Sequence, residues 1–575
     1  MIGIWSLFFI VLLWEVHLPP SASNFIQGKR VKVSVDSFSG AVRLVNNQQQ
    51  SIELLDRNGK LIVQKVSNDA DRFEDCYGTP YMGLFGIFKM PTCYCIGVIS
   101  NSAPIPDTPL QDIHAIYSVH FIRIPLVNKV YEEKLWAKQM EAERLLTETL
   151  RKHSFVFSSS GNYDVTKCLQ ANVLDHIESN SGHHYDERFF WNYNSNKLFL
   201  DLGLDAFVTP VTNAFITNDV IQTGDQKYQL TLISRRSRRR QGPRYIKRGS
   251  DAEGHVANFV ETEQILQDRC SFLSSFVQIR GSIPLLWKQP SSAWRRKQIP
   301  SLSTSDLMSH VKVLKLHLRD LYQRYCTHWT APVRSDVARN ATNASSDSDD
   351  KETREEALSG PGVLFVNLID KVGRQGALGN WLYQAFKQLS PISSSASFSG
   401  PKSGNGSLAP LMHAQTASVN ADLVNRDVTT WQDFPCPKPG SSSDAGGSLL
   451  ARYIWFDYHH RLKHGDFGPC RELIPLLLPA LQAKEGGFFS AWFTKPNEST
   501  TQIDGGAGMQ TDPQNVQWRV DAASKMRLQN RIIRTNCMDC LDRTNVVQSM
   551  ISLWVLERQL MHLNPEWKHE NSEVG

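Results

Sequence analysis

The segment that most restricts the fold lies near the C-terminal end, where a short apolar run meets a loop of cysteine, aspartate and arginine. RIIR (531–534) can form a strand, and NVVQSMISLWVLERQLMHL (545–563) has the apolar spacing of a helix. RTNCMDCLDRTN (534–545) joins the two. A strand, a tight loop and a helix in this order direct backbone N–H groups and the positive helix end at a bound anion. The sequence therefore predicts an α/β unit with an anion-binding loop.

Within this loop, Cys537 is followed after five residues by Arg543, which is the minimal phosphatase pattern. A bound phosphate would meet the planar guanidinium of Arg543, whose fork matches two phosphate oxygens. The same positive field would lower the pKa of Cys537 from ~8.5 toward roughly 3.5–7.5, so that its thiolate could attack phosphorus. The pattern alone is weak because so short a motif also arises by chance.

The leaving oxygen needs a proton, and the covalent intermediate needs an activated water. Asp539 and Asp542 lie within the loop and are the nearest candidates for both tasks. The alternative is that their carboxylates only accept backbone hydrogen bonds and hold the loop in shape. The sequence leaves both interpretations open.

The loop also contains a CxxC pattern, Cys537 to Cys540, which allows a redox or metal site or merely a buried turn. Dithiol redox enzymes of this type favour a thioredoxin-like βαβ setting. A structural zinc would need two further ligands at suitable spacing, and no second CxxC pattern accompanies this one. We therefore expect no metal and no cofactor. Cys540 is better interpreted as a neighbouring thiol that could trap oxidised Cys537 as a disulfide.

The rest of the chain divides by its pattern into a β-rich first part and an α/β second part. In the first part, 30–35 and 41–45 are expected to form a hairpin, 117–127 a strand, and 132–152 a surface helix. In the second part, apolar β-type runs alternate with helical stretches such as 307–325, which predicts a largely parallel sheet covered by helices. The three runs are 228–234, 363–369 and 452–458.

Two polar segments, 338–362 and 391–448, interrupt the second part and are expected to be disordered insertions. Composition is otherwise that of a soluble globular protein, with 41% hydrophobic and 21% charged residues. A net charge of +5 is slight for 575 residues, so bulk charge does not indicate a nucleic-acid partner.

Positive charge is concentrated in one run, 235–248, which contains seven arginines and one lysine. This run could bind an anionic membrane surface, at about 1 kcal/mol per basic residue. It could equally be a solvated loop in which some arginines are tied into the fold. The candidates for membrane or substrate binding are Arg235, Arg236, Arg244, Lys247 and Arg248.

The loop sequence RTNCMDCLDRTNVVQS closely resembles the active-site signature of the Sac-domain phosphoinositide phosphatases. A second long block, 232–265, and the segment FVQIRGSIPLLW (276–287) are also similar to that family. Weaker similarities occur at 155–170, 187–192, 363–373 and 452–459. Together these blocks span roughly residues 80–560 in order. The combination of GHVANFVETEQ with CMDCLDRTN most resembles the branch that acts on phosphatidylinositol 4-phosphate at endoplasmic reticulum and Golgi membranes.

The resemblance implies an N-terminal β-rich subdomain (25–188) packed on an α/β catalytic subdomain (189–575), cysteine-based hydrolysis and no metal requirement. Carried across, Cys537 is the nucleophile, Arg543 binds the phosphate, and the Thr544 hydroxyl assists the leaving or attacking oxygen. The phosphate-binding loop also contains Met538, Cys540 and Leu541. Four residues of the 232–265 block are expected to support the catalytic loop: Arg248, Asp251, Glu253 and His255. For Glu261 and Glu263 of the same block a structural role is equally compatible with the sequence.

The resemblance further implies a phosphoinositide substrate, phosphatidylinositol 4-phosphate or the 3-phosphate, and a catalytic domain that faces the cytosol, where a thiolate stays reduced. The hydrophobic leader (1–24) argues the other way, because it has the shape of a secretory signal or is an artefact of the chosen start. The chain also ends about 30 residues after the motif, whereas the family domain continues, so the protein is expected to be truncated.

Two other functions remain open on the sequence. A protein tyrosine phosphatase would share the loop chemistry, although the long similar blocks disfavour it. A catalytically inactive lipid-binding or scaffold protein would follow from the early end of the chain, although Cys537 and Arg543 are both present.

Overall fold

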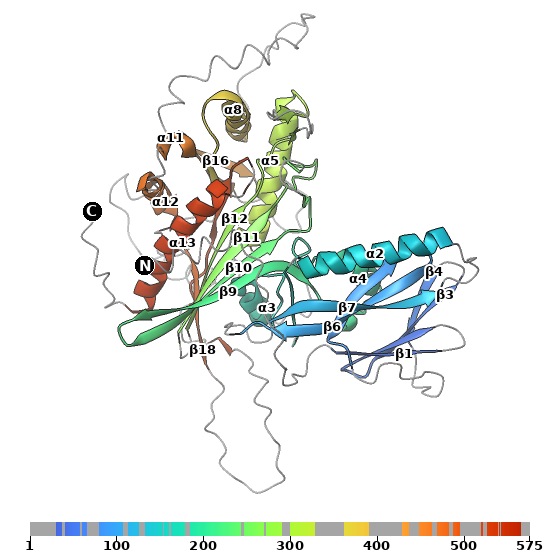
Figure 1. Cartoon of the computed structure of the whole chain (residues 1–575). Helices are drawn as coiled ribbons and strands as arrows, with labels where there is room; N and C mark the ends of the chain where they lie inside the picture. The colour runs from blue at the N-terminus through green and yellow to red at the C-terminus, as the bar shows by residue number, and fades with distance from the viewer. Residues whose placement is uncertain are drawn as a thin grey trace, which may run out of the picture. The chain divides into compact units, whose positions relative to one another are not determined.

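The computed structural model describes most of the chain between residues 30 and 564 (Figure 1). The described residues are 30–36, 41–57, 60–65, 80–106, 113–125, 133–152, 154–159, 163–178, 185–242, 247–268, 272–289, 300–327, 362–389, 428–435, 448–462, 468–481, 487–494, 519–520, 526–538, 540 and 542–564. The leader (1–24), residues 338–361 and most of 391–448 lie outside them.

The described residues form two compact units. The N-terminal unit contains those up to Asp219 together with Thr231–Arg238, and the C-terminal unit contains Val220–Leu230 and those from Arg239 onward. The sequence alone places a boundary between residues 188 and 189, whereas residues 189–219 group with the N-terminal unit.

The N-terminal unit contains two antiparallel sheets. One is a meander of β1 (Val31–Val35), β2 (Val42–Asn46), β3 (Ser51–Arg57) and β4 (Lys60–Lys65). Val31 pairs with Asn46 and Val35 with Val42, so the expected hairpin is confirmed. Side chains alternate between buried and more exposed along β3, as expected of a sheet with one face on the core.

The second sheet of this unit pairs its long strands in the order β9-β8-β7-β6-β5. The strands are β5 (Gly83–Lys89), β6 (Cys93–Pro104), β7 (Ile113–Pro125), β8 (Phe155–Ser158) and β9 (Thr212–Thr223). The expected strand and surface helix are confirmed as β7 and α2 (Glu133–Lys152). The other helical elements are α3 (Leu169–Glu178), α4 (Tyr193–Asp201) and the 3₁₀ turn Asp205–Phe207.

The sheet of the C-terminal unit is mixed, which corrects the expectation of a largely parallel one. Its strands run in the order β16-β17-β15-β20-β12-β11. Only the three central pairings, β17 with β15, β15 with β20 and β20 with β12, are parallel. Both flanks, β16 on β17 and β11 on β12, are antiparallel. A buried apolar run is compatible with either direction, so periodicity alone could not separate them.

The strands in this order are β11 (Val260–Gln267), β12 (Phe272–Arg280), β15 (Gly362–Asn367), β16 (Val428–Pro435), β17 (Ser448–Trp455) and β20 (Arg531–Asn536). The predicted runs 363–369, 452–458 and 531–534 overlap β15, β17 and β20, and the run 228–234 lies within the strand Gln226–Arg236. β18 (Phe489–Thr494) pairs with β12 and with β19 (Arg519–Val520). β13 (Trp287–Lys288) and β14 (Ser301–Leu302) form a separate pair. β10 (Gln226–Arg236) continues from one unit into the other.

Strand β16 corrects the expectation that 391–448 is disordered throughout. Val428–Pro435 pairs over its whole length with β17. Its sequence, VTTWQDFP, has the β-branched and aromatic residues that strands favour. The Ser- and Gly-rich residues on either side obscured that short signal.

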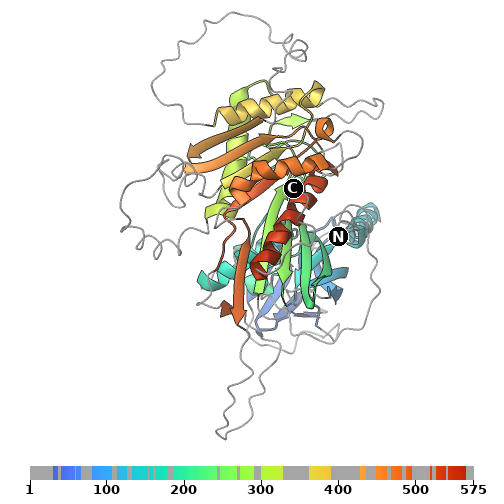
Figure 2. The same cartoon turned by 90° about the vertical axis from the view of Figure 1, so that its left-hand side faces the viewer.

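Helices lie on both faces of the C-terminal sheet (Figure 2). On one face α13 (Asp542–Leu563) and α12 (Leu473–Leu481) share an apolar core with β15, β17 and β20. On the other, α5 (Leu307–Tyr322), its π-helical end Gln323–Thr327, and α8 (Gly373–Lys387) pack together, and the ring of Phe386 contacts Phe365 edge-on and Tyr453 at a tilt. α11 (Tyr458–Arg461) and the 3₁₀ turn Gly468–Glu472 follow β17.

Within the part of the chain that the structure describes, none of the helices has the length and apolar character needed to cross a membrane.

Candidate active site

Three neighbouring parallel strands, β17, β15 and β20, end at one edge of the C-terminal sheet. Their last residues are in register, with Trp455 opposite Asn367 and Asn367 opposite Asn536. Open α/β sheets bind ligands in the crevice outside the carboxyl ends of such strands. The segment from Cys537 to Arg543 follows β20 at this edge, so the sequence motif lies where the topology favours a site.

Polar side chains join the three strand ends. The Asn536 amide donates to the side-chain oxygen of Asn367 over 2.7 Å, and the Asn367 amide donates to the Tyr453 hydroxyl over 2.8 Å. All three residues are fully buried. Because a buried polar group is costly without a partner, these bonds favour one alignment of the strands.

The backbone of Cys540 faces the sulfur of Cys537. The backbone N–H of Cys540 donates to Cys537 Sγ over 3.0 Å. Cys540 adopts a left-handed backbone conformation with φ of 57°, which turns its N–H back toward the start of the loop. Both cysteines are buried and Met538 is half-buried. Asp539 and Leu541 lie outside the described residues. A backbone donor aimed at sulfur favours a thiolate over a thiol.

Helix α13 begins at Asp542, three residues before the start expected from the apolar pattern. Arg543 and Thr544 are therefore in its first turn, where the helix macrodipole is positive. Thr544 is fully buried, whereas Asp542 is exposed.

The guanidinium of Arg543 rests on the segment that follows β15. One nitrogen, Nη1, donates to the carbonyl of Leu368 over 3.2 Å, to Gln375 Oε1 over 3.0 Å and to Asp370 Oδ1 over 3.3 Å. These partners fix one nitrogen of the fork, and they lie about 170 residues away in the sequence, a separation that local pattern cannot bridge.

Asp370 connects Arg543 to the segment that follows β17. Its Oδ1 atom also accepts from His459 Nδ1 over 2.8 Å, and its Oδ2 atom accepts from the Gln375 amide over 2.7 Å. Asp457, which caps α11, accepts from the backbone N–H of Lys371 over 2.8 Å. The segments after β15 and β17 are thereby joined to each other and to α13. Neither Asp370 nor His459 was predicted from the sequence as a site residue, although they lie in the similar blocks 363–373 and 452–459.

Arg534, in β20, is a charged residue buried completely beneath the loop. Its guanidinium donates to His317 Nε2 over 3.3 Å and to the carbonyls of Thr535 and Ser282. It also lies 4.6 Å from the ring centre of Phe365. Since His317 accepts from Arg534 through Nε2, its Nδ1 carries the proton and donates to the carbonyl of Gly254 over 3.1 Å. The partners of Arg534 are therefore neutral.

Burial lowers the pKa of Arg534 to about 10, and the nearby sulfurs of Cys540 and Cys537 act in the opposite direction. Burial raises the pKa of Cys540 well above its ordinary value, and its neighbour Cys537 adds to the rise. Cys540 is thus a neutral thiol at pH 7. Among the described residues no carboxylate pairs with Arg534, so its charge is positioned to stabilise negative charge on the sulfur of Cys537. The sequence signal for this role was an arginine, Arg534, that directly follows two apolar residues within a short buried strand.

The SacI homology domain matches residues 82–463. The chain belongs to the SacI homology domain family. The Cys537–Arg543 loop lies after the matched residues. Strands β15 and β17, together with Asp370 and His459 that follow them, lie within the matched residues.

Three curated relatives of this Sac-domain chain have about a quarter of their aligned residues identical to it. Phosphoinositide phosphatase SAC6 of Arabidopsis thaliana is 26% identical over 522 residues, which is 89% of this chain and 65% of the relative. Phosphatidylinositol-3-phosphatase SAC1 of Saccharomyces cerevisiae is 25% identical over 80% of this chain and 55% of its own length. Uncharacterized protein C19F5.03 of Schizosaccharomyces pombe is 26% identical over 78% and 55%. The chain thus spans between about half and two thirds of these relatives.

The basic run of this Sac-domain chain is largely tied into the fold. Arg235 is fully buried and donates to the carbonyl of Val165 and to the Tyr163 hydroxyl, both over 2.9 Å. Arg248 is buried and donates to Gln289 Oε1 over 3.0 Å. Neither side chain is at a surface, so the expectation that they contact a membrane is corrected.

The other three candidates of the run differ. Arg236 is half-buried, and burial lowers its pKa. Lys247 is exposed, and Arg244 lies outside the described residues. Lys247 is therefore the candidate whose position permits contact with an anionic surface.

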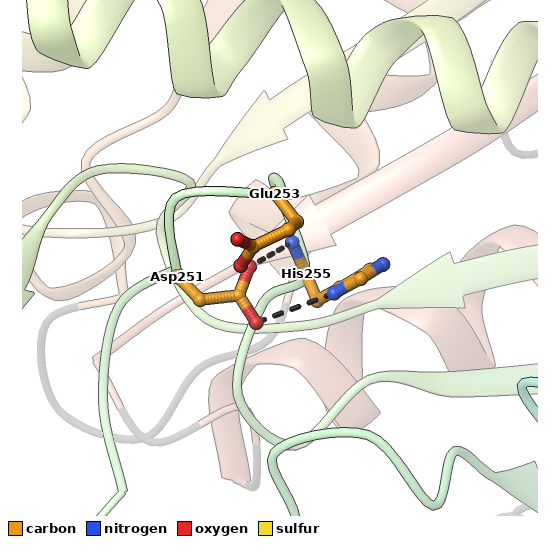
Figure 3. A group of neighbouring side chains, drawn as sticks. All are labelled: Asp251, Glu253 and His255. Atoms are coloured by element: carbon orange, nitrogen blue, oxygen red, sulfur yellow. Dashed lines mark hydrogen bonds and ion pairs between the residues drawn. The ribbon is translucent and has the colours of Figure 1, made fainter.

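Asp251, Glu253 and His255 form the one group of metal-ligating type found among the described residues (Figure 3). Both ring nitrogens of His255 are engaged, with Nδ1 donating to Asp251 Oδ2 over 3.2 Å and Nε2 accepting from Arg239 over 2.7 Å. The Asp251 carboxylate also accepts from the backbone N–H of His255 over 2.8 Å. A neighbouring guanidinium repels a cation, so the chemistry of this group favours a hydrogen-bonded turn.

Proposed function

We propose that this Sac-domain chain is a phosphoinositide phosphatase that hydrolyses the phosphate of phosphatidylinositol 4-phosphate or 3-phosphate through a phosphocysteine intermediate. The observation that carries the proposal is the position of Cys537. Its sulfur accepts a backbone N–H at the end of β20, and Arg543 lies in the first turn of the helix that follows. Family membership and the printed names of the relatives support the same activity.

In the proposed reaction the thiolate of Cys537 attacks phosphorus, the bond from phosphorus to the inositol oxygen breaks, and the phosphoryl group is carried on sulfur. Arg543 binds two oxygens of the transferred group, and the loop N–H groups of Met538, Cys540 and Leu541 stabilise the charge that develops there. The Thr544 hydroxyl assists the leaving or attacking oxygen. Water then attacks phosphorus and restores the thiolate.

The same loop offers two carboxylates, Asp539 and Asp542, as candidates for moving the proton in each step. Asp542 is exposed at the first residue of α13. Each would have to lie within hydrogen-bond reach of the inositol oxygen in the bound complex.

The preference for a monophosphate rests on charge and size. A bisphosphate brings a second dianionic group, which a narrow loop with one arginine admits less easily.

The substrate would be presented on an anionic membrane surface, for which Lys247 is an exposed contact. We further propose that the catalytic unit faces the cytosol at endoplasmic reticulum or Golgi membranes, because the mechanism needs a reduced cysteine.

The test is phosphate release by the full chain from vesicles containing phosphatidylinositol 3-phosphate, 4-phosphate or 4,5-bisphosphate, and from a phosphotyrosyl peptide. We expect release from the monophosphate lipids, a much smaller rate on the bisphosphate, and none from the peptide. Cys537→Ser should abolish release because a serine hydroxyl does not ionise at neutral pH. Cys168→Ser, which changes a buried cysteine of the N-terminal unit, is the matched control.

Two outcomes would replace this proposal. Turnover of the peptide with none of the lipids would indicate a protein phosphatase. Binding to the vesicles without release of phosphate would indicate an inactive lipid-binding or scaffold protein.

A further inference from the structure

Two sequence blocks that the loop chemistry does not use meet beside Arg543. One follows β15 and contributes Asp370 and Gln375, and the other follows β17 and contributes His459. Because β15, β17 and β20 are parallel and in register, both blocks emerge at the sheet edge where Cys537 lies. Their side chains form a connected group with the guanidinium of Arg543.

Asp370 Oδ1 is shared by two cationic or proton-bearing partners. It accepts from Arg543 Nη1 over 3.3 Å and from His459 Nδ1 over 2.8 Å. The imidazole of His459 and the guanidinium of Arg543 are therefore bonded to the same carboxylate oxygen of Asp370. Gln375 donates to the other oxygen, Oδ2, over 2.7 Å and accepts from Arg543 through its own oxygen over 3.0 Å. This bracing fixes the carboxylate and, through it, the imidazole.

His459 has the geometry of a proton carrier. Its Nδ1 is held by Asp370, which fixes the ring orientation and leaves Nε2 as the nitrogen that can exchange a proton. The side chain is 57% exposed, whereas Asp370 is 22% exposed. A histidine oriented by a carboxylate is the arrangement that general acid–base catalysis uses in unrelated enzymes.

The residue before His459 supports this placement. Tyr458 belongs to the same apolar cluster as Cys537. Burial raises the pKa of Tyr458 to about 12, and Arg543, Asp542 and Cys537 also act on its hydroxyl. Tyr458 is therefore neutral at pH 7, and its ring centre lies 5.9 Å from that of His459. The start of α11 thus lies among the groups of the loop.

We propose that His459 is the proton donor and acceptor of the phosphatase reaction and that Asp370 is its positioning residue; this assignment rests on the proposed function. In the first step the thiolate of Cys537 bonds to phosphorus, the bond to the inositol oxygen breaks, and that oxygen takes the proton from His459 Nε2. In the second step neutral His459 removes a proton from water as the water oxygen bonds to phosphorus. The phosphorus–sulfur bond then breaks, the thiolate is restored and inorganic phosphate leaves.

Three charged or titratable side chains lie around His459. Asp370 faces Nδ1 from the segment after β15, Arg543 faces Asp370 from α13, and neutral Tyr458 adjoins it on α11. Asp370→Asn keeps the shape of the side chain but removes its negative charge. If Asp370 positions His459, this variant should lower kcat on a lipid whose leaving group needs a proton more than on an activated aryl phosphate.

The experiment compares His459→Gln with His460→Gln in the full chain. His460 is the next residue of α11 and is also exposed, so it is a matched control outside the proposed machinery. Each variant is assayed on a short-chain phosphatidylinositol 4-phosphate, whose leaving group is poor, and on an activated aryl phosphate, whose leaving group needs no proton. Thermal unfolding of both variants shows that the fold is kept.

We expect His459→Gln to lower kcat on the lipid by about 100-fold or more and on the aryl phosphate by less than about threefold, with the basic limb of the pH profile removed. His460→Gln should match the wild type on both. Equal losses on the two substrates, or a His459→Gln rate on the lipid within about threefold of the control, would overturn the assignment while the proposed function stands. A wild-type chain inactive on all lipids would overturn both.

Discussion

The backbone N–H of Cys540 donates to the sulfur of Cys537 over 3.0 Å, while the thiol of Cys540 itself is buried and faces away from solvent. The two cysteines of this CxxC pattern therefore differ in their surroundings and in their tendency to ionise. The sulfur of Cys537 accepts a hydrogen bond from a backbone N–H, and Cys537 lies five residues before Asp542, where α13 begins. Burial and the neighbouring sulfur raise the pKa of Cys540, which keeps it protonated.

The first prediction concerns stability at alkaline pH. Because the pKa of folded Cys540 is raised above its ordinary value of 9.0, the unfolded chain releases this proton first as pH rises. The unfolded state then binds fewer protons than the native state, so the free energy of unfolding falls above about pH 9. Cys540→Ala should show a shallower fall than Cys168→Ala in denaturant titrations between neutral and alkaline pH. Parallel curves for the two variants would refute a raised pKa at Cys540.

Arg543→Lys should lose most phosphatase activity. An ammonium supplies a point charge and cannot make the planar two-point contact with phosphate. We expect kcat/KM to fall by more than about tenfold, roughly 1.4 kcal/mol of transition-state stabilisation. Arg558→Lys, on the exposed side of the same helix, is the control and should be unchanged. A loss smaller than tenfold at Arg543 would rule out the bidentate role.

Arg534→Met should make Cys537 a weaker nucleophile without removing any group that touches the substrate. The buried guanidinium has neutral partners, so its charge is available to favour the thiolate. We expect alkylation of Cys537 by iodoacetamide at neutral pH to slow by about tenfold. Arg531→Met, three residues earlier in β20 and also buried, controls for loss of a buried arginine. Equal alkylation rates in the two variants would exclude an electrostatic role for Arg534.

Asp539→Asn and Asp542→Asn separate proton transfer from loop support. A proton donor should lose more on an inositol lipid than on an activated aryl phosphate, because only the first substrate needs the proton. With His459 as donor, each aspartate variant should lose to a similar extent on both substrates. A selective loss on the lipid in one variant would instead assign the proton to that aspartate.

The sequence predicted the local elements of the site well because each has its own signal. The short apolar run became β20 and the periodic stretch became α13. The helix began at Asp542 instead of Asn545, since its polar first turn lacks the apolar spacing by which a helix start is recognised. The hairpin of β1 and β2 and the surface helix α2 were predicted for the same reason: their patterns are local.

The sequence could not predict which distant segments complete the site. Asp370 and His459 reach Arg543 only because β15, β17 and β20 are adjacent and parallel, and strand order is not encoded in any one segment. The burial of Arg534 and Arg235 was also not predicted from the sequence. The sequence left open whether the basic run around Arg235 is exposed, and it assigned no role to Arg534. Hydrogen bonds to internal carbonyls allow both guanidiniums to be buried, and Arg534 also bonds to His317.

The most direct test of the central claim is to trap the covalent intermediate. The full chain is mixed with phosphatidylinositol 4-phosphate labelled in its phosphate, quenched in acid within the first turnover, and digested for mass analysis of the peptide that contains Cys537. The account predicts labelled phosphate on Cys537 in the wild type and its absence in Cys537→Ser, with Cys540 unlabelled in both. Release of labelled phosphate by the wild type with no label on Cys537 at any time, or unimpaired release by Cys537→Ser, would contradict it.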